Sequence, residues 1–235
     1  MITTVRSRQR MFALALPITV ALYISAEALD PKGTDQIVTT TATAFKLLPI
    51  AAHHSTQLYV SATLTELALG AVALSYGAIA MLVRKRGSTL ATIAVLVGGL
   101  GAFCGAIVNV FVGLNLAVAA TAGVMRDAAA RFLITSFNSR PGQALTDIYA
   151  FSEYLAPVIM GVALWRSRCV PRWLAVLFVA GFELAEQTGS VGGARVVLQM
   201  APFGLAMILL AVQIWRRAES AAPRFDPHQS PMVAV

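Results

Sequence analysis

Residues 61–86, SATLTELALGAVALSYGAIAMLVRKR, decide the fold class of this chain. The stretch is an apolar run that contains one acid, Glu66, and ends in three consecutive cations. A bilayer core about 30 Å thick is crossed by about 20 apolar residues of α-helix. Residues 61–83 therefore predict a membrane-spanning helix, and the RKR that follows predicts that this end of the helix faces the cytoplasm.

The whole chain has the composition of a membrane protein. Of its 235 residues, 57% are hydrophobic and 12% are charged, whereas soluble domains have about 45–50% apolar and about 25% charged residues. A net charge of +7 is also found in nucleic-acid-binding proteins. Here, however, the cations gather in short segments between apolar runs, so we predict no nucleic-acid partner.

Six apolar runs predict an all-α, polytopic transmembrane bundle of six helices, which occupies residues 1–217. A polar tail with three prolines, residues 218–235, is expected to be disordered. The fifth span is short for a full crossing. The predicted spans are residues 11–29, 61–83, 89–111, 147–165, 173–187 and 195–215.

The distribution of charge predicts that both termini are cytoplasmic. Twelve of the eighteen Lys and Arg residues, but only two of the eleven acids, lie in four segments: before the first span, after the second, between the fourth and fifth, and after the sixth. This is the pattern of the positive-inside rule. Trp165, Trp173 and Trp215 fall at the same boundary, where aromatic anchors are expected.

The first span could instead be a secretory signal, because it follows a basic segment and contains the small-x-small sequence Ala26-Glu27-Ala28. We favour a retained span, since it places the later basic loops on the same side as the N-terminus. Cleavage would leave five spans and an external N-terminus.

Two long connections are predicted on the outer side. Residues 30–59 are too polar to span and too apolar for a simple linker, so we predict a short interfacial or re-entrant helix that is interrupted near Pro49 and covers the bundle. Residues 114–146 begin apolar and turn polar, which predicts an interfacial helix followed by an ordered loop.

Small residues predict two helix faces. Gly98, Gly101 and Gly105 recur at helical spacing in the third span and would let a neighbouring helix approach closely. A second stripe, on the second span, is expected to face the interior of the bundle. It consists of Ser55, Tyr59, Glu66, Gly70, Ala73 and Gly77.

Acids within the spans are the most informative feature for function. An ionised side chain at the centre of a membrane helix costs about 2.5–3.5 kcal/mol on insertion scales, so it is expected to face the interior, pair or protonate. One interpretation is that these acids form ion pairs at the outer ends of the helices. The other is an outward-facing acidic cavity, with Arg195 as the partner of Glu183 or Glu186. The predicted ligand-binding residues are Glu66, Asn109, Glu153, Glu183, Arg195 and Gln199.

Several classes of site have no support in the sequence. Adjacent histidines such as His53 and His54 point about 100° apart on a helix, and no HExxH pattern is present, so we predict no metal site. No phosphate-binding glycine loop, Walker lysine or Gly-x-Ser-x-Gly occurs, and we predict no cofactor. Cys104 and Cys169 should lie at different depths and form no disulfide.

The residues leave open whether the protein is an enzyme. We predict a membrane protein that binds or moves a small amphipathic or lipidic ligand. The alternative is an intramembrane enzyme, such as an isoprenoid or terpenoid cyclase, with Glu66 or Glu183 as general acid. A third possibility is a structural subunit. The expected partners are the bilayer, a hydrophobic small molecule and another membrane protein.

The segment ALWRSRCVPRWLAVLFVAG, residues 163–181, resembles a pattern in uncharacterised bacterial six-span membrane proteins that carry a domain of unknown function. The long connection after the first span and the basic turn after the second also fit their layout. The resemblance covers most of residues 11–215 in architecture but only about twenty residues in motif. It implies the bacterial inner membrane and no known activity.

Overall fold

The structure, a computed structural model, describes residues 2–31, 38–83, 86–121, 125–186 and 194–220; the side chains of residues 2–6, 121, 186 and 194–196 lie outside this description. All its regular elements are helices. They are α1 (Ile2–Leu29), α2 (Thr41–His53), α3 (Ser55–Ala80), α4 (Ser88–Asn109), the π-helix η1 (Val110–Leu114), α5 (Asn115–Thr121), α6 (Arg126–Asn138), α7 (Arg140–Ser167), α8 (Arg172–Glu186) and α9 (Ala194–Ser220).

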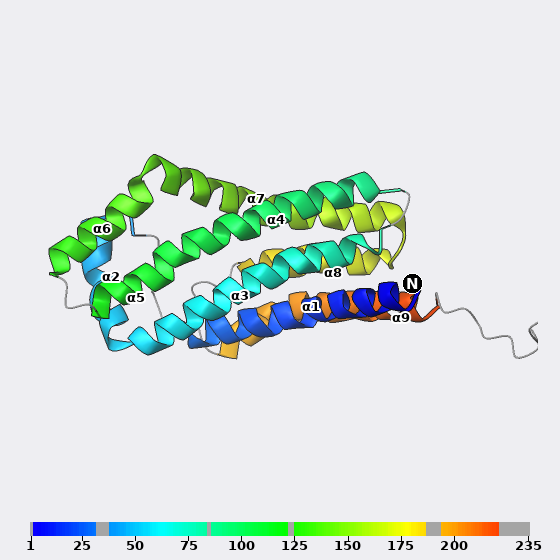
Figure 1. Cartoon of the computed structure of the whole chain (residues 1–235), viewed down its shortest axis with the longest axis horizontal. Coiled ribbons are helices and arrows are strands. Elements are labelled where there is room, and N and C mark those ends of the chain that lie inside the picture. Colours follow the sequence, from blue (N-terminus) through cyan, green and yellow to red (C-terminus); the bar gives the residue numbers. More distant parts are fainter. Residues whose placement is uncertain (1, 32–37, 84–85, 122–124, 187–193, 221–235) are drawn as a thin grey trace, which may run out of the picture.

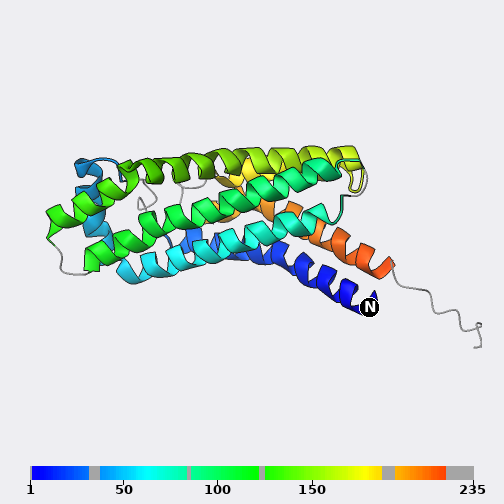
Figure 2. The ribbon, with the colours of Figure 1, turned by 45° about the horizontal axis from the view of Figure 1, so that its top comes forward.

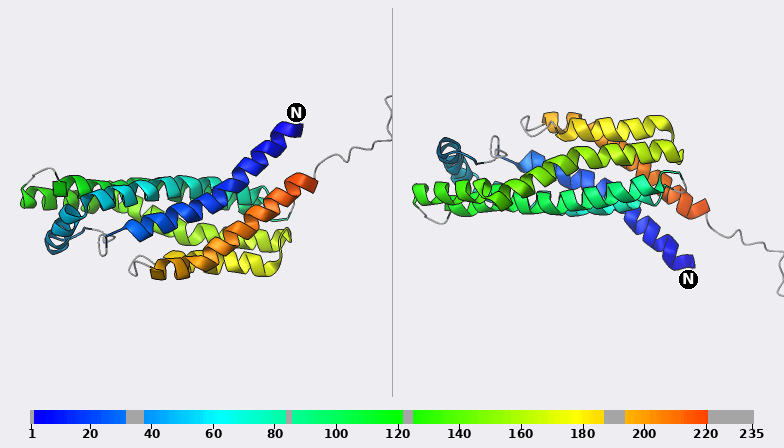
Figure 3. Two further views of the ribbon diagram at one scale, coloured as in Figure 1. Left: turned by 90° about the horizontal axis from the view of Figure 1, so that it is seen from below. Right: turned by 90° about the horizontal axis from the view of Figure 1, so that it is seen from above.

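The long axis of the molecule is followed by α1, α3, α4, α7, α8 and α9 (Figure 1). Of these, α3, α4 and α7 extend beyond the ends of α1, α8 and α9. There they meet α2, α5 and α6, which with η1 form what we call the headpiece. Figure 3 shows α1 and α9 side by side and oblique to the longer helices.

The N-terminal end of α1 and the C-terminal end of α9 lie at the end opposite the headpiece, together with the end of α3, the start of α4 and the α7–α8 turn (Figures 1 and 2). We call this the basic end. The exposed arginines there are Arg8, Arg86, Arg166, Arg168, Arg172 and Arg216.

Five helical segments in the described part of the chain are long and apolar enough to cross a membrane. They lie in α1, α3, α4 with its continuation to Ala120, α7 and α9. The fifth predicted span, residues 173–187, corresponds to α8, but the 15 residues of α8 extend only about 22 Å at 1.5 Å per residue. Six full spans are therefore not confirmed. The N-terminal end of α1 and the C-terminal end of α9 lie at the same end of the bundle (Figure 1).

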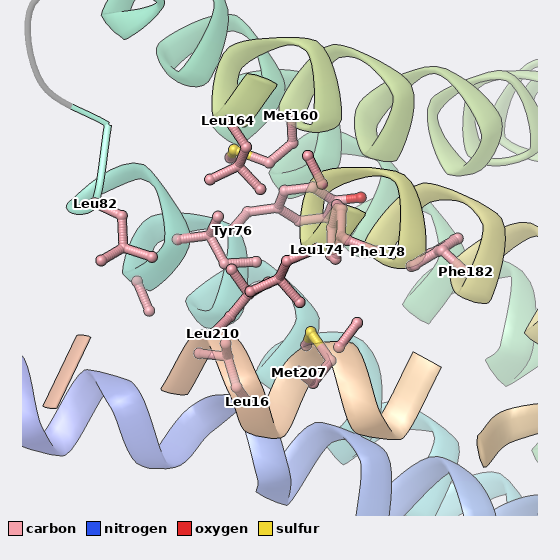
Figure 4. Close-up of a cluster of buried hydrophobic side chains, with 14 of the residues drawn as sticks. Leu16, Tyr76, Leu82, Met160, Leu164, Leu174, Phe178, Phe182, Met207 and Leu210 are labelled. Carbon is pink, nitrogen blue, oxygen red and sulfur yellow. The ribbon is translucent and has the colours of Figure 1, made fainter. Parts of the chain in front are cut away.

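The main core joins α1, α3, α4, α7, α8 and α9. Within it, Phe178 of α8 is 2% exposed, and Leu16 of α1 and Leu210 of α9 are fully buried. The contribution of α1 includes a polar contact as well, since Thr19 and Ser75 of α3 are hydrogen-bonded at 3.0 Å inside the core. Retention of the first span stays a prediction. Figure 4 shows side chains of this core from α1, α3, α7, α8 and α9 and from the turn after α3: Leu16, Tyr76, Leu82, Met160, Leu164, Leu174, Phe178, Phe182, Met207 and Leu210.

The glycine stripe on α4 packs as the sequence predicted. A Cβ added at Gly98 would lie 2.7 Å from the Tyr76 ring, and one added at Gly101 would lie 2.5 Å from Cβ of Ser152. A Cβ added at Gly105 would lie 2.6 Å from the Tyr149 ring. α4 therefore approaches α7 at distances that only glycine allows.

The predicted inward stripe on α3 is wrong. A Cβ added at Gly70 or at Gly77 would meet nothing within 4 Å. The buried face lies beside it and includes Ser61, Ser75 and Tyr76. The reason is that Ser61 donates a hydrogen bond to the carbonyl of residue 26, and Ser75 bonds Thr19, so these hydroxyls turn their own face of α3 toward α1.

The headpiece has its own core, formed mainly by α2, α5 and α6. The predicted interruption at Pro49 is wrong: α2 continues through this exposed proline because Leu47, Leu48 and Ala51 are buried around it. The helix ends at His54 instead, and α3 starts at the next residue.

The ordered loop predicted within residues 114–146 is also wrong. α4 continues through η1 and α5, α6 follows, and α7 starts at Arg140 rather than near residue 147. Ser139 caps α7 by accepting a hydrogen bond from the amide of Gly142 at 3.1 Å, and Pro141 lies in the first turn. This is an ordinary helix start, and proline there costs no hydrogen bond.

Candidate functional site

A cavity of about 160 Å³ lies between α1, α3, α4 and α7 on the headpiece side of the bundle. Its lining combines apolar side chains with a group of polar ones that come from all four helices or from the residue just after α1. The polar lining residues are Glu27, Asp30, Ser61, Thr65, Asn109 and Tyr149. Two carboxyl groups and no Lys or Arg are among the described lining residues, so the cavity is acidic.

Asn109 connects the cavity to Glu66. Its Nδ2 donates to Oε1 of Glu66 at 3.2 Å and to the carbonyl oxygen of Ala62 at 3.0 Å. Glu66 is half-buried on α3 and is not among the lining residues. Asn109 therefore lines the cavity, and Glu66, which lies outside the lining, accepts a hydrogen bond from the side-chain amide of Asn109.

The π-helix η1 starts directly after Asn109. A π-helical turn inserts an extra residue into a helix and is frequent at functional sites. Here it brings Gly113 to the cavity wall, where an added Cβ would lie 2.7 Å from Cβ of Ala62. The sequence carries no sign of this turn beyond the glycine itself, because residues 110–114, VFVGL, are as apolar as the run before Asn109.

Tyr149 separates Glu153 from the cavity. The Tyr149 hydroxyl donates to Oε1 of Glu153 at 2.6 Å, one helical turn away on α7. Tyr149 lines both the cavity and a smaller hollow toward the basic end, whereas Glu153 lines only the smaller one. The hydrogen bond from Tyr149 therefore links Glu153 to the cavity.

The other predicted site residues lie elsewhere. Glu183 of α8 and Gln199 of α9 are half-buried, and neither lines the cavity. Oε1 of Gln199 is buried and has no hydrogen-bond partner among the described residues. Arg195 belongs to α9, but its side chain is outside the described part, so its predicted pairing with Glu183 or Glu186 stays a prediction.

Sequence reasoning thus found one lining residue, Asn109, and the acid behind it. It missed Ser61, Thr65 and Tyr149, and Glu27 was not among the predicted ligand-binding residues. A serine and a threonine in an apolar run carry no signal by themselves, since both can bond the backbone of their own helix, as Thr65 does to the carbonyl of Ser61 at 3.1 Å.

The two histidines contact each other and a neighbouring glutamine. Their rings are in an edge-to-face contact with centroids 4.8 Å apart, and Nδ1 of His54 is hydrogen-bonded to Gln57 at 2.8 Å. Among the residues that the structure describes, no group of three His, Cys, Asp or Glu side chains is placed to hold a metal ion. Both cysteines are free thiols.

No family model matches this sequence, and no curated protein and no solved structure matches it either. The resemblance to bacterial six-span proteins therefore stays a prediction. What can be said of the site rests on its own geometry.

The Asn109–Glu66 contact predicts a pH-dependent variant. In Asn109→Asp, an ionised carboxylate replaces the amide donor and faces two acceptors, which should cost about 2–3 kcal/mol of unfolding free energy. Thermal unfolding in detergent should show a lower midpoint at pH 8 and partial recovery at pH 4, where a protonated Asp can donate again.

Adding Glu66→Gln to that variant supplies an amide donor at the other position and should restore part of the stability at pH 8. A double variant no more stable than Asn109→Asp at pH 8 would show that this hydrogen bond does not stabilise the fold.

Proposed function

We propose that this protein is a multi-pass membrane protein that binds the polar head group of a small amphipathic ligand in the cavity between α1, α3, α4 and α7. The observation that carries this proposal is the amide of Asn109, held by Glu66 at the start of a π-helical turn and forming part of an acid-lined cavity wall. Polar side chains within membrane-spanning helices cost free energy, and where they occur they usually mark a functional site.

We further propose that the basic end faces the cytoplasm of a bacterial inner membrane and the headpiece faces outward, with α8 as a short sixth span. The exposed arginines at one end and the acids Glu27 and Asp30 toward the other support this orientation. The cavity then opens toward the outer leaflet, below the headpiece helices.

The size and the polar lining of the cavity restrict the class of ligand that it can hold. A volume of about 160 Å³ corresponds to about five water molecules at roughly 30 Å³ each. That space suits a head group and not a whole lipid, so we propose binding rather than transport in this conformation. The polar lining groups include hydrogen-bond acceptors from all sides of the cavity, so a head group that donates hydrogen bonds suits this lining.

The alternative, an intramembrane enzyme that uses a glutamic acid as general acid, has one observation in its favour. The Tyr149 hydroxyl, which lines the cavity, is hydrogen-bonded to Glu153 and could pass its proton to a substrate. Neither Glu66 nor Glu183 lines the cavity. An enzyme of this kind would lose turnover in Tyr149→Phe while still binding its substrate.

Native mass spectrometry of the gently extracted protein tests the proposed function with a matched pair of variants. Thr65 and Thr63 both bond the carbonyl four residues earlier on α3, but only Thr65 lines the cavity. We expect a co-purifying small amphipathic molecule on the wild type, at least tenfold less of it on Thr65→Phe, and an unchanged amount on Thr63→Phe.

A wild-type protein without any co-purifying molecule, or equal occupancy in Thr65→Phe, would contradict the proposal. The identity of the molecule would then separate a ligand from a substrate, because a substrate would be converted by the wild type on incubation.

A further inference from the structure

A second hollow lies between α7 and α8, on the basic-end half of the bundle and away from the cavity described above. Its volume is about 530 Å³, within the range of about 300–1,000 Å³ that ligand sites have. Figure 3 shows α8 at the edge of the bundle, so this groove is on an outer face. Its lining residues are all apolar, and several are exposed, among them Val158, Val162, Trp165 and Val176.

Small residues at the bottom of the groove make it concave. Gly161 of α7 packs so closely against Val179 of α8 that a Cβ there would overlap the valine side chain, which brings the two helices together at the floor. Ala175 and Ala180 line the same groove from α8. The larger side chains of Val162 and Val176 stand at its sides, 44% and 53% exposed.

Cations surround the end of the groove nearest the basic end. Arg166, Arg168 and Arg172 are all exposed and lie in or beside the α7–α8 turn. The guanidinium carbon of Arg172 lies 5.1 Å from the centroid of the Trp165 ring, and Trp165 itself lines the groove. In the described part of the chain no acid pairs with these three arginines. One guanidinium is thus placed at the mouth, and the described residues supply no acid that neutralises these arginines.

We propose that this groove binds one anionic phospholipid, with an acyl chain along the groove and the phosphate at the arginines of the α7–α8 turn. The depth agrees with this. The lining runs from residue 165 to residue 158 on α7, about 10 Å at 1.5 Å per residue, and a lipid tail fills a leaflet of about 15 Å. The acyl chain would fill the groove and pack against its apolar side chains. The phosphate would neutralise the positive charge of the arginines in the α7–α8 turn.

Charge also favours a lipid over a second copy of this chain. A symmetric dimer through the groove would bring two sets of exposed arginines together, and like charges across an interface disfavour association. An anionic lipid removes the same repulsion.

The test uses the full-length protein in detergent, titrated with phosphatidylglycerol or phosphatidylcholine and followed by native mass spectrometry. We expect one phosphatidylglycerol to bind at least tenfold more tightly than phosphatidylcholine. Arg166→Gln/Arg172→Gln should reduce phosphatidylglycerol binding about tenfold and leave phosphatidylcholine binding unchanged. Arg216→Gln, which removes an exposed arginine at the same end but on α9, should leave the preference intact.

A second pair of variants tests the groove itself. Val162 and Val212 are 44% and 38% exposed, and only Val162 lines the groove. Val162→Trp should block phosphatidylglycerol binding and Val212→Trp should not, with thermal unfolding as the check that both variants fold. Equal binding of the two lipids, an equal loss in Arg216→Gln, or full binding by a folded Val162→Trp would overturn the proposal. A lipid-free dimer that Val162→Trp dissociates would overturn it as well.

Discussion

Gly101→Leu is expected to lower the unfolding free energy of this protein by about 3 kcal/mol. The Cβ alone would lie 2.5 Å from Cβ of Ser152, on a helix that α4 contacts along much of its length. Ser152 is 5% exposed and is enclosed by the bundle, so α7 cannot yield locally. The variant must separate α4 from α7 or distort both.

Gly99→Leu is the matched control, because it is the same substitution two residues away on the same helix. A Cβ at Gly99 meets nothing within 4 Å, and leucine is a better helix former than glycine by about 0.8 kcal/mol. Thermal unfolding in detergent should show Gly101→Leu about 6–12 °C below the wild type, from about 2–4 °C per kcal/mol for a chain of this size. Gly99→Leu should match the wild type or exceed it.

Equal midpoints for the two variants would mean that the close approach of α4 and α7 does not stabilise the protein. A loss in both would mean that Gly99 faces a neighbour, and the rotation of α4 would have to be revised.

The helical segments could be predicted from the sequence because hydropathy and length determine them. All six predicted spans coincide with helices, and the stripe of Gly98, Gly101 and Gly105 correctly predicted a tightly packed face. Small residues gave the wrong face on α3, however, because Gly70 and Gly77 are not packed against a neighbour. A glycine allows close approach but does not require it, and the partner helix is not visible in a single sequence.

The headpiece was the harder part to predict. Arg126, Asp127 and Arg131 made residues 126–138 look like a loop, but α6 buries Ala129, Ala130, Leu133 and Phe137 on one face. This is the pattern of an ordinary amphipathic helix, with one apolar face and one charged face. A reading based on hydropathy alone treats any charged segment between spans as a connection.

The cavity could be predicted only in part, because its polar lining is assembled from four helices. The acid of Glu66 was visible as a charge within a span, and Asn109 as a polar residue beside a glycine stripe. What joins them is the crossing of α3 and α4 and the π-helical turn that follows. Neither follows from the local sequence.

Arg217→Gln is expected to destabilise the basic end of the bundle. Nη1 of Arg217 donates to the carbonyl oxygen of Leu82 and Nη2 donates to that of Cys169, both at 2.7 Å. Leu82 follows the end of α3 and Cys169 lies in the α7–α8 turn, so one side chain of α9 satisfies carbonyls that the ends of helices leave without a partner. Hydrogen bonds from a charged group contribute about 1.5–3 kcal/mol each, and we expect a total loss of about 3 kcal/mol.

The neighbouring Arg216 supplies the control, because it is exposed and has the same charge. Arg216→Gln should change the unfolding free energy by less than about 0.5 kcal/mol, as surface substitutions do. If the loss in Arg217→Gln comes from the two-pronged geometry and not from charge, Arg217→Lys should recover only part of it, since an ammonium group cannot reproduce the planar fork of a guanidinium. Thermal unfolding midpoints that fall in the order wild type, Arg217→Lys, Arg217→Gln would support this account. A lysine variant as stable as the wild type would assign the effect to charge alone.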